Sequence, residues 1–137
     1  MNIHLTLTAL PERFAICRLD RKESIPCWAH QRDFSSITYT REELSIVCPE
    51  EAVPKEVSRE DGWRCFEVEG PLPFELTGIL ADLSDALSQE RISIFAISTF
   101  DTDYILVKSE DFQRAIITLQ ERGHKIGCQK DSASEAN

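Results

Sequence analysis

The segment from Arg91 to Lys108, RISIFAISTFDTDYILVK, decides how this chain folds. It contains two apolar runs rich in β-branched residues, Ile92–Ser98 and Tyr104–Val107, joined by the polar link Thr99–Asp103. β-Branched and aromatic residues favour strands, and a short polar link between two such runs is typical of a corner. The segment therefore predicts a strand, a polar corner and a second strand.

The segments on both sides of this strand pair have a helical pattern. Before it, apolar residues recur at helical spacing within Thr77–Glu90, and after it the same spacing runs from Phe112 to Arg122. We therefore expect each strand of the pair to have a helix as its neighbour along the chain.

Capping residues narrow down the ends of these two helices. The first helix begins either at Pro73, whose missing N–H costs nothing at a helix start, or at Gly78 with Thr77 as the cap. For the second helix, Ser109 is the expected N-cap and Gly123 is the expected residue after the C-cap.

Two further predicted strands, Arg64–Glu69 and His124–Cys128, complete the second half of the chain. The order is then βαββαβ, which is ferredoxin-like. Right-handed crossovers place the first and third of these strands side by side in the middle of a four-stranded antiparallel sheet, with both helices on one face. The fold class that we expect is α+β.

The first half of the chain is rich in strands. Ile3–Thr8 and Phe14–Leu19 are expected to be strands, separated by a turn at Leu10–Arg13. Ser36–Thr40 and Leu44–Cys48 are expected to form a hairpin. Because this hairpin repeats the strand, corner, strand plan of the second half, we interpret the first half as a degenerate copy packed against the second.

The acidic, proline-containing segment Pro49–Gly62 predicts a connection between the two halves. We therefore expect three regions. Residues 1–60 form the degenerate N-terminal half, residues 61–129 form the ferredoxin-like domain, and residues 130–137 form a disordered tail.

Composition argues against several classes of protein. Asp and Glu number 24 against 15 Lys and Arg, for a formal net charge of −9, and the clustered basic residues needed to bind nucleic acid are absent. No apolar run approaches the roughly 20 residues of a membrane helix, so we expect no membrane partner. The five cysteines form no C-x-x-C pair, which predicts reduced thiols and a cytoplasmic protein.

Sequence motifs for catalysis and for metal binding are absent. His4, His30 and His124 have no metal-ligand spacing, and there is neither a glycine-rich phosphate loop nor a G-x-S-x-G elbow. We therefore expect no catalytic residue, no metal and no cofactor, and we do not expect an enzyme.

Two stretches carry candidate binding groups, and each also has a plainer explanation. Asp101 and Asp103 either hold a cation or an ammonium group at the corner or form an Asx turn, and the residues alone favour the turn. The segment Gly70–Ile79 either offers helix-start N–H groups to a carboxylate or simply connects a strand to a helix. The residues alone again favour the plainer explanation.

A resemblance to a known family changes this balance. Leu72–Phe74, Thr77–Ala81 and the I-S-T-F-x-x-D pattern within Ile94–Val107 resemble an ACT domain. The similarity is to tandem ACT-domain proteins, which include aspartate kinase regulatory domains and a cytosolic arginine sensor of TOR signalling. It covers Cys65–Cys128 strongly and the first half more weakly.

The resemblance implies a regulatory module that binds an amino acid where two ACT units meet. The groups implied to bind are the loop after the first strand and the corner with its flanking residues. Among them, Asp103 is implied to be the acidic group that contacts the ligand. The ligand-binding positions carried over to this chain are Gly70, Pro73, Phe74, Thr77, Gly78, Ile79, Ser98, Thr99, Phe100 and Asp103.

One position departs from the family pattern. The arginine sensor has a glutamate in the loop where this chain has Leu76, and the difference removes one acidic partner for a basic side chain. The implied partners are a small-molecule amino acid ligand, a second copy of the chain in a homodimer, and a metabolic enzyme or another regulator. The alternative is a protein-interaction module that keeps the ACT fold but binds no ligand.

Overall fold

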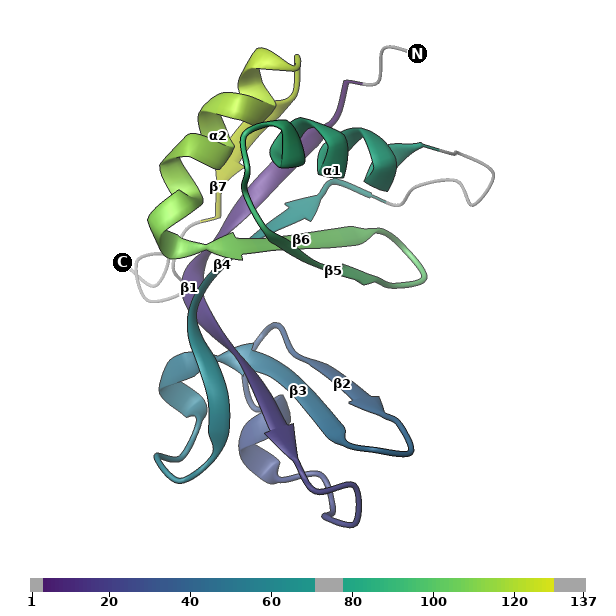
Figure 1. Ribbon diagram of the computed structural model, residues 1–137, viewed down its shortest axis with the longest axis vertical. Helices are drawn as coiled ribbons and strands as arrows, with labels where there is room; N and C mark the ends of the chain where they lie inside the picture. The colour runs from purple at the N-terminus through teal and green to yellow at the C-terminus, as the bar shows by residue number, and fades with distance from the viewer. Residues whose placement is uncertain (1–3, 71–77, 130–137) are drawn as a thin grey trace. The chain divides into compact units, whose positions relative to one another are not determined.

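The computed structural model describes residues 4–70 and 78–129 (Figure 1). They belong to two units. Unit 1 combines the described residues of Met1–Pro11 with those of Arg64–Asn137, and unit 2 is Glu12–Trp63. The start of the chain thus joins the C-terminal part, which differs from the division expected at residue 60.

Unit 1 is a sheet covered on one face by two helices (Figure 1). Its strand order is β7-β1-β4-β6-β5. The chain from β4 to β7 follows the predicted βαββαβ order, and the α+β class is confirmed. The elements are parts of β1 (Thr6–Leu19) and β4 (Ser58–Val68), then α1 (Ile79–Gln89), β5 (Ile94–Ser98), β6 (Asp103–Lys108), the 3-10 helix η3 (Ser109–Asp111), α2 (Phe112–Glu121) and β7 (Lys125–Cys128).

The apolar core of unit 1 lies between this sheet and the two helices. Successive side chains of a strand point to opposite faces, so alternate residues such as Phe66 and Val68 of β4 reach the core. The helices bury the residues that recur at helical spacing, which confirms that both cover the same face. These helical residues are Ile79, Leu83, Leu87, Phe112, Ala115 and Leu119.

The sheet of unit 1 differs from the four-stranded antiparallel sheet that we expected. The predicted neighbours β4 and β6 are adjacent, but β1 pairs with both β4 and β7, and its pairing with β7 is parallel. The physical reason is that successive side chains of β1 point to opposite faces of the sheet, so that Leu7 and Ala9 are buried in the core beneath the helices. This pairing also explains why the first residues of the chain belong to unit 1.

Unit 2 contains the strand order β2-β3-β1 together with the first residues of β4, 58–63. Its predicted hairpin is confirmed as β2 (Ser36–Tyr39) and β3 (Leu44–Pro49), whose pairing is antiparallel. Two 3-10 helices, η1 (Cys27–His30) and η2 (Glu50–Ala52), complete the unit. Its buried core consists of Ala15, Cys17, Leu19, Ala29, Leu44, Ile46, Cys48 and Val53.

The prediction of two strands at the start of the chain was wrong, because β1 is one strand of 14 residues that includes Pro11. A proline interrupts a sheet only where its missing N–H is needed by a neighbouring strand. Pro11 follows Ala9, the last residue paired with β7, and precedes Phe14, the first residue paired with β3. The missing N–H therefore breaks neither ladder.

The prediction of a connection that extends to Gly62 was also wrong, because β4 already begins at Ser58. Local partners satisfy the polar groups at this end of the strand. A guanidinium N–H of Arg59 donates to the carbonyl of Pro54 over 2.8 Å, and the N–H of Gly62 donates to Oε2 of Glu50 over 2.9 Å. A charged strand end of this kind has the composition of a loop.

The two helices of unit 1 begin differently from one another. Gly78, with φ of 85°, is the N-cap of α1, so the later of the two expected starts is nearly correct and the helix begins one residue further on. For α2, the expected N-cap at Ser109 was wrong. Ser109 begins η3, and α2 follows with Asp111 as its N-cap.

The end of α2 is a Schellman motif, as the glycine at position 123 predicted. Gly123 has φ of 102°, a left-handed conformation that glycine adopts without strain. Its N–H donates to the carbonyl of Gln120 over 2.9 Å, and the N–H of His124 donates to that of Leu119 over 3.1 Å. This turn places His124 directly behind the helix end.

Candidate ligand site

The predicted corner is the connection between β5 and β6. Ser98 and Asp103 are directly opposite each other as the last pair of the ladder. The hydroxyl of Ser98 donates a hydrogen bond to Oδ1 of Asp103 over 2.6 Å. Asp103 is therefore the first residue of β6, and Ser98 fixes the orientation of its carboxylate.

Threonines form the hydrogen bonds within the corner. The N–H of Thr99 donates to the carbonyl of Thr102 over 2.8 Å, and the N–H of Thr102 donates to Oγ1 of Thr99 over 3.3 Å. The carboxylate of Asp103 is bonded across the strands rather than to its own backbone. The Asx turn that the residues alone favoured at this position is therefore replaced by a threonine-based turn.

Thr102 also attaches the corner to the neighbouring strand. Its side chain is buried, with 7% of the residue exposed, and its hydroxyl donates to the carbonyl of Val68 over 2.7 Å. Val68 is the last residue of β4, two positions before Gly70. The corner is thus held beside the point where the predicted ligand loop begins, a role for Thr102 that its place in a polar segment did not indicate.

The carboxylate of Asp103 retains binding capacity. Oδ1 accepts the Ser98 hydroxyl, and among the described residues no donor is bonded to Oδ2. The residue is partly buried, so a ligand cation at Oδ2 would be only partly screened by water. An ionised carboxylate fixed in this way is suited to an ammonium or guanidinium group.

The neighbouring residue Tyr104 has an altered acidity. Its hydroxyl donates to Oε2 of Glu67 over 3.3 Å. Burial, together with the negative charge of Glu67, raises the pKa of Tyr104 to about 12. The phenol therefore stays neutral at physiological pH and remains a hydrogen-bond donor.

The other described part of the predicted site is the start of α1. The N–H of Asp82 donates to the carbonyl of Gly78 over 2.8 Å and closes the first helical turn. The N–H groups that precede Asp82 have no acceptor within the helix, since an α-helix leaves its first N–H groups unpaired. Ile79 contributes only its backbone here, because its side chain is buried in the core.

The predicted site residues therefore fall into three groups. Ser98, Thr99 and Asp103 are together at the corner, and Phe100 is at the same corner with 78% of its surface exposed. Gly70 follows β4, while Gly78 and Ile79 form the start of α1. The remaining three predicted positions lie outside the described residues: Pro73, Phe74 and Thr77.

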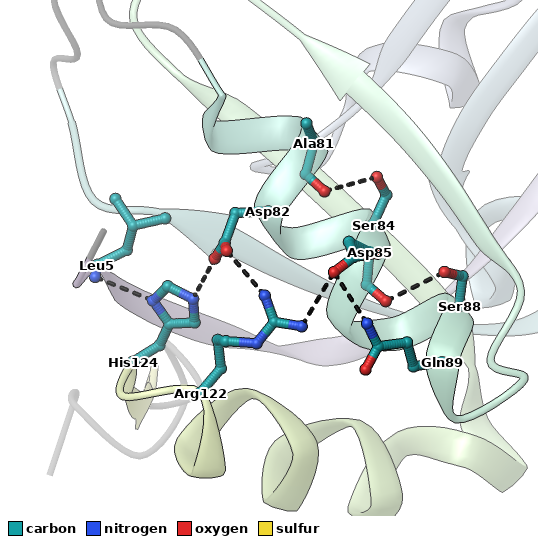
Figure 2. Close-up of polar contacts among 9 residues, drawn as sticks. All are labelled: Leu5, Ala81, Asp82, Ser84, Asp85, Ser88, Gln89, Arg122 and His124. Atoms are coloured by element: carbon teal, nitrogen blue, oxygen red, sulfur yellow. Dashed lines mark hydrogen bonds and ion pairs between the residues drawn. The ribbon is translucent and has the colours of Figure 1, made fainter. Parts of the chain in front are cut away.

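A polar network next to the start of α1 was missed by the sequence reasoning (Figure 2). The buried ring of His124 accepts the N–H of Leu5 at Nδ1 over 3.0 Å. Its proton is therefore on Nε2, which donates to Oδ2 of Asp82 over 3.0 Å. A histidine without metal-ligand spacing gives no sequence signal of such a role.

Arg122 completes this network from the C-cap of α2 (Figure 2). Its guanidinium donates to Oδ1 of Asp82 over 2.9 Å and to Oδ2 of Asp85 over 3.2 Å. The hydrogen bond with Asp85 and the charge of Asp82 raise the pKa of Arg122 above its ordinary value. The only sequence signal was the spacing of Asp82 and Asp85, which lie on one face of α1.

Two hollows on the described surface have none of the predicted ligand residues in their lining. One of about 340 Å³ is lined by α1 and α2 and includes Ala86 and Ile117. A second, of about 770 Å³, belongs to unit 2 and includes Ile25 and Trp28.

The part of the chain described holds no group of three or more His, Cys, Asp or Glu side chains placed to bind a metal ion. The cysteines are free, and a hydrogen bond with Cys48 together with burial raises the pKa of the Cys17 thiol. Within residues 4–70 and 78–129, no helix is long and apolar enough to cross a membrane.

Two family models match the sequence of this chain. The ACT domain matches residues 58–121, and an N-terminal domain family matches residues 12–56. Among curated proteins, the cytosolic arginine sensor for mTORC1 subunit 1 of Bos taurus is 36% identical over 66 residues. The matched part is 47% of this chain and 20% of that protein, so the chain spans about a fifth of the length of this relative.

Solved structures extend the similarity to both units. A protein from Agrobacterium tumefaciens is 39% identical, with a TM-score of 0.89 over 94% of this chain and 96% of that one. The ligand-free regulatory subunit of aspartate kinase from Thermus thermophilus has a TM-score of 0.61 over 89% of this chain and 99% of that one. At 10% identity, this second likeness is one of fold alone.

Proposed function

This chain belongs to the ACT-domain proteins, and we propose that its ACT domain binds a free amino acid and has no catalytic activity of its own. The ACT domain is a ligand-binding regulatory module, and ACT domains typically bind small molecules. The proposal adds the chemical class of the ligand and the residues that hold it.

The observation that carries the proposal is the fixed carboxylate of Asp103. Ser98 holds Oδ1 at 2.6 Å, and Oδ2 has no donor in the described chain. A cation that binds Oδ2 would meet a carboxylate that is already oriented, so little ordering entropy is lost on binding. The α-ammonium of an amino acid, or a basic side chain, has the required charge.

The start of α1 is the part of the site that we propose to bind the opposite end of the ligand. Free N–H groups and the positive end of the helix dipole favour an anion such as an α-carboxylate. Gly78 has no Cβ, so a ligand is able to approach the backbone closely at this point. We propose that Gly70, Gly78 and the backbone of Ile79 contribute on this side, together with Pro73, Phe74 and Thr77.

The ligand need not be the one in the name of the curated relative. That protein is named for sensing arginine, and it matches this chain over 66 residues. A long basic side chain needs acidic partners, and this chain has Leu76 where the resemblance places a glutamate. We therefore propose an amino acid, with no preference for arginine.

The wider role that we propose is regulatory. The protein would act in the cytoplasm as a homodimer and control a metabolic enzyme or another regulator according to the amino acid supply. The alternative is a protein-interaction module that keeps the ACT fold but binds no ligand.

A thermal-shift series with the twenty standard amino acids tests this function. We expect one amino acid, or one chemically related group, to raise the unfolding temperature in a concentration-dependent way, because a ligand that binds only the folded state stabilises it. If none of them does so over a wide concentration range, the proposed function is wrong.

A further inference from the structure

Asp82 is bonded through both its backbone and its side chain at the start of α1. Its N–H donates to the carbonyl of Gly78 over 2.8 Å. Its carboxylate accepts from His124 at Oδ2 over 3.0 Å and from Arg122 at Oδ1 over 2.9 Å (Figure 2). One residue thus connects the N-cap of α1 with the turn that follows α2.

This arrangement requires a carboxylate at position 82. Nδ1 of His124 accepts the N–H of Leu5, so the proton on Nε2 must meet an acceptor. Arg122 also presents a donor, and only an ionised carboxylate offers a full acceptor to each of them. An asparagine would turn its NH₂ group toward one of these donors and leave it unpaired.

The N-cap gives α1 little support of its own. Gly78 has no side chain, and the cap makes no side-chain hydrogen bond to the first turn. The side chain of Asp82 fixes the first turn of the helix, and the fully buried ring of His124 holds this side chain in place. The direction of the free N–H groups at the helix start therefore depends on the contacts of Asp82.

We infer that Asp82 is a positioning residue that holds the start of α1 in the orientation needed to bind the ligand carboxylate. The inference rests on the proposed function, since it concerns the same site. Asp82 acts through the hydrogen bond of its N–H with the carbonyl of Gly78, which closes the first turn. A binding group that is held in place in advance loses less entropy when the ligand arrives.

Asp85 provides a matched control on the same helix. It also bonds Arg122, at 3.2 Å, and has the same charge as Asp82. Its side chain is 59% exposed, against 17% for Asp82, and His124 is bonded to Asp82. Substitution of either residue removes one negative charge and one contact of Arg122, but only Asp82 joins His124 to the helix start.

The experiment compares Asp82→Asn with Asp85→Asn in the full chain. The probes are an equimolar mixture of the twenty L-amino acids and the matching mixture of L-amino acid amides, which lack the carboxylate charge. We expect Asp82→Asn to lose about tenfold in affinity for the amino acids and to bind the amides as the wild type does. Asp85→Asn should stay within about twofold of wild type for both mixtures.

Hydrogen exchange at the amide of position 82 gives a readout that needs no ligand. We expect faster exchange in Asp82→Asn than in Asp85→Asn, because the bond to Gly78 is then less well held. Equal exchange in the two variants, or equal losses for amino acids and amides, overturns the inference. If Asp82→Asn does not fold, Arg122→Gln takes its place, since it removes one of the two side-chain contacts of Asp82.

A failure of the proposed function has a different signature. In that case the wild type itself responds to neither mixture, whereas a failure of the inference leaves the wild-type response intact and removes the difference between the two variants.

Discussion

The hydroxyl of Ser98 donates to Oδ1 of Asp103 across the last pair of the β5–β6 ladder, over 2.6 Å. This bond orients the carboxylate of Asp103, and among the described residues no donor is bonded to its second oxygen. The sequence alone favoured a simple turn at this place. The family resemblance favoured a ligand contact, and the geometry of the carboxylate supports that interpretation.

Substitution of Asp103 by asparagine should weaken amino acid binding without unfolding the protein. A hydrogen bond to a charged group contributes about 1.5 to 3 kcal/mol, so we expect a loss of about 10-fold to 100-fold in affinity by calorimetry. Asp101→Asn is the control, because Asp101 is exposed and its substitution removes the same charge from the same corner. Equal losses in both variants would show that net charge alone attracts the ligand.

Thr102 should be important for stability through one hydrogen bond. Thr102→Val keeps the shape of the side chain but leaves the buried carbonyl of Val68 without its donor at 2.7 Å. We expect a loss of about 1 to 3 kcal/mol in the free energy of unfolding, measured with urea. Thr102→Ser restores the hydroxyl and should recover most of this loss, and the same loss in both variants would argue against the hydrogen bond.

Leu119 and Ile117 of α2 should differ in their effect on stability. Leu119 is fully buried in the core, whereas Ile117 is 53% exposed. Leu119→Ala should destabilise unit 1 by about 2 to 5 kcal/mol, because it removes buried methyl groups and leaves a cavity. Ile117→Ala should change the free energy of unfolding by less than about 1 kcal/mol. Similar losses would mean that α2 packs differently.

Tyr104 should make stability depend on pH in the alkaline range. Its pKa is raised from 10.0 to about 12 in the folded protein, so folding favours the neutral phenol. This contribution is complete below about pH 10 and is lost as the pH rises toward 12. Urea unfolding across this range should therefore show a smaller decline for Tyr104→Phe than for wild type. If Tyr104→Phe declines as steeply as wild type, the burial of Tyr104 does not influence its ionisation.

Local patterns predicted much of the second half of the chain. The helical spacing in 77–90 and 112–122 located α1 and α2, and Gly123 located the end of α2. These features depend on neighbours along the chain. The pairing of β1 with β7 depends on distant residues, and no local pattern indicated that β1 would enter this sheet.

Strand ends were harder to predict for a similar reason. Pro11 has the appearance of a turn residue, and only its position between two ladders makes it acceptable within β1. Ser58 to Gly62 has a charged composition, and only specific partners such as Glu50 allow it to extend β4. In both cases the tertiary pairing outweighs local propensity.

The candidate site was predicted in part. Asp103 and Gly78 came from the family resemblance, whereas the attachment of Thr102 to Val68 and the contacts of Asp82 join residues far apart in sequence. Ser98 was included as a ligand position, and the structure adds that it orients Asp103. The ligand contacts of all predicted positions remain predictions.

Isothermal titration calorimetry of the wild-type protein with single amino acids tests the central claim most directly. We expect saturable binding of at least one amino acid, weaker binding of the amide of the same amino acid, and markedly weaker binding to Asp103→Asn. If no amino acid gives saturable heat with the folded wild type, or if Asp103→Asn binds as tightly as wild type, the proposed site is contradicted.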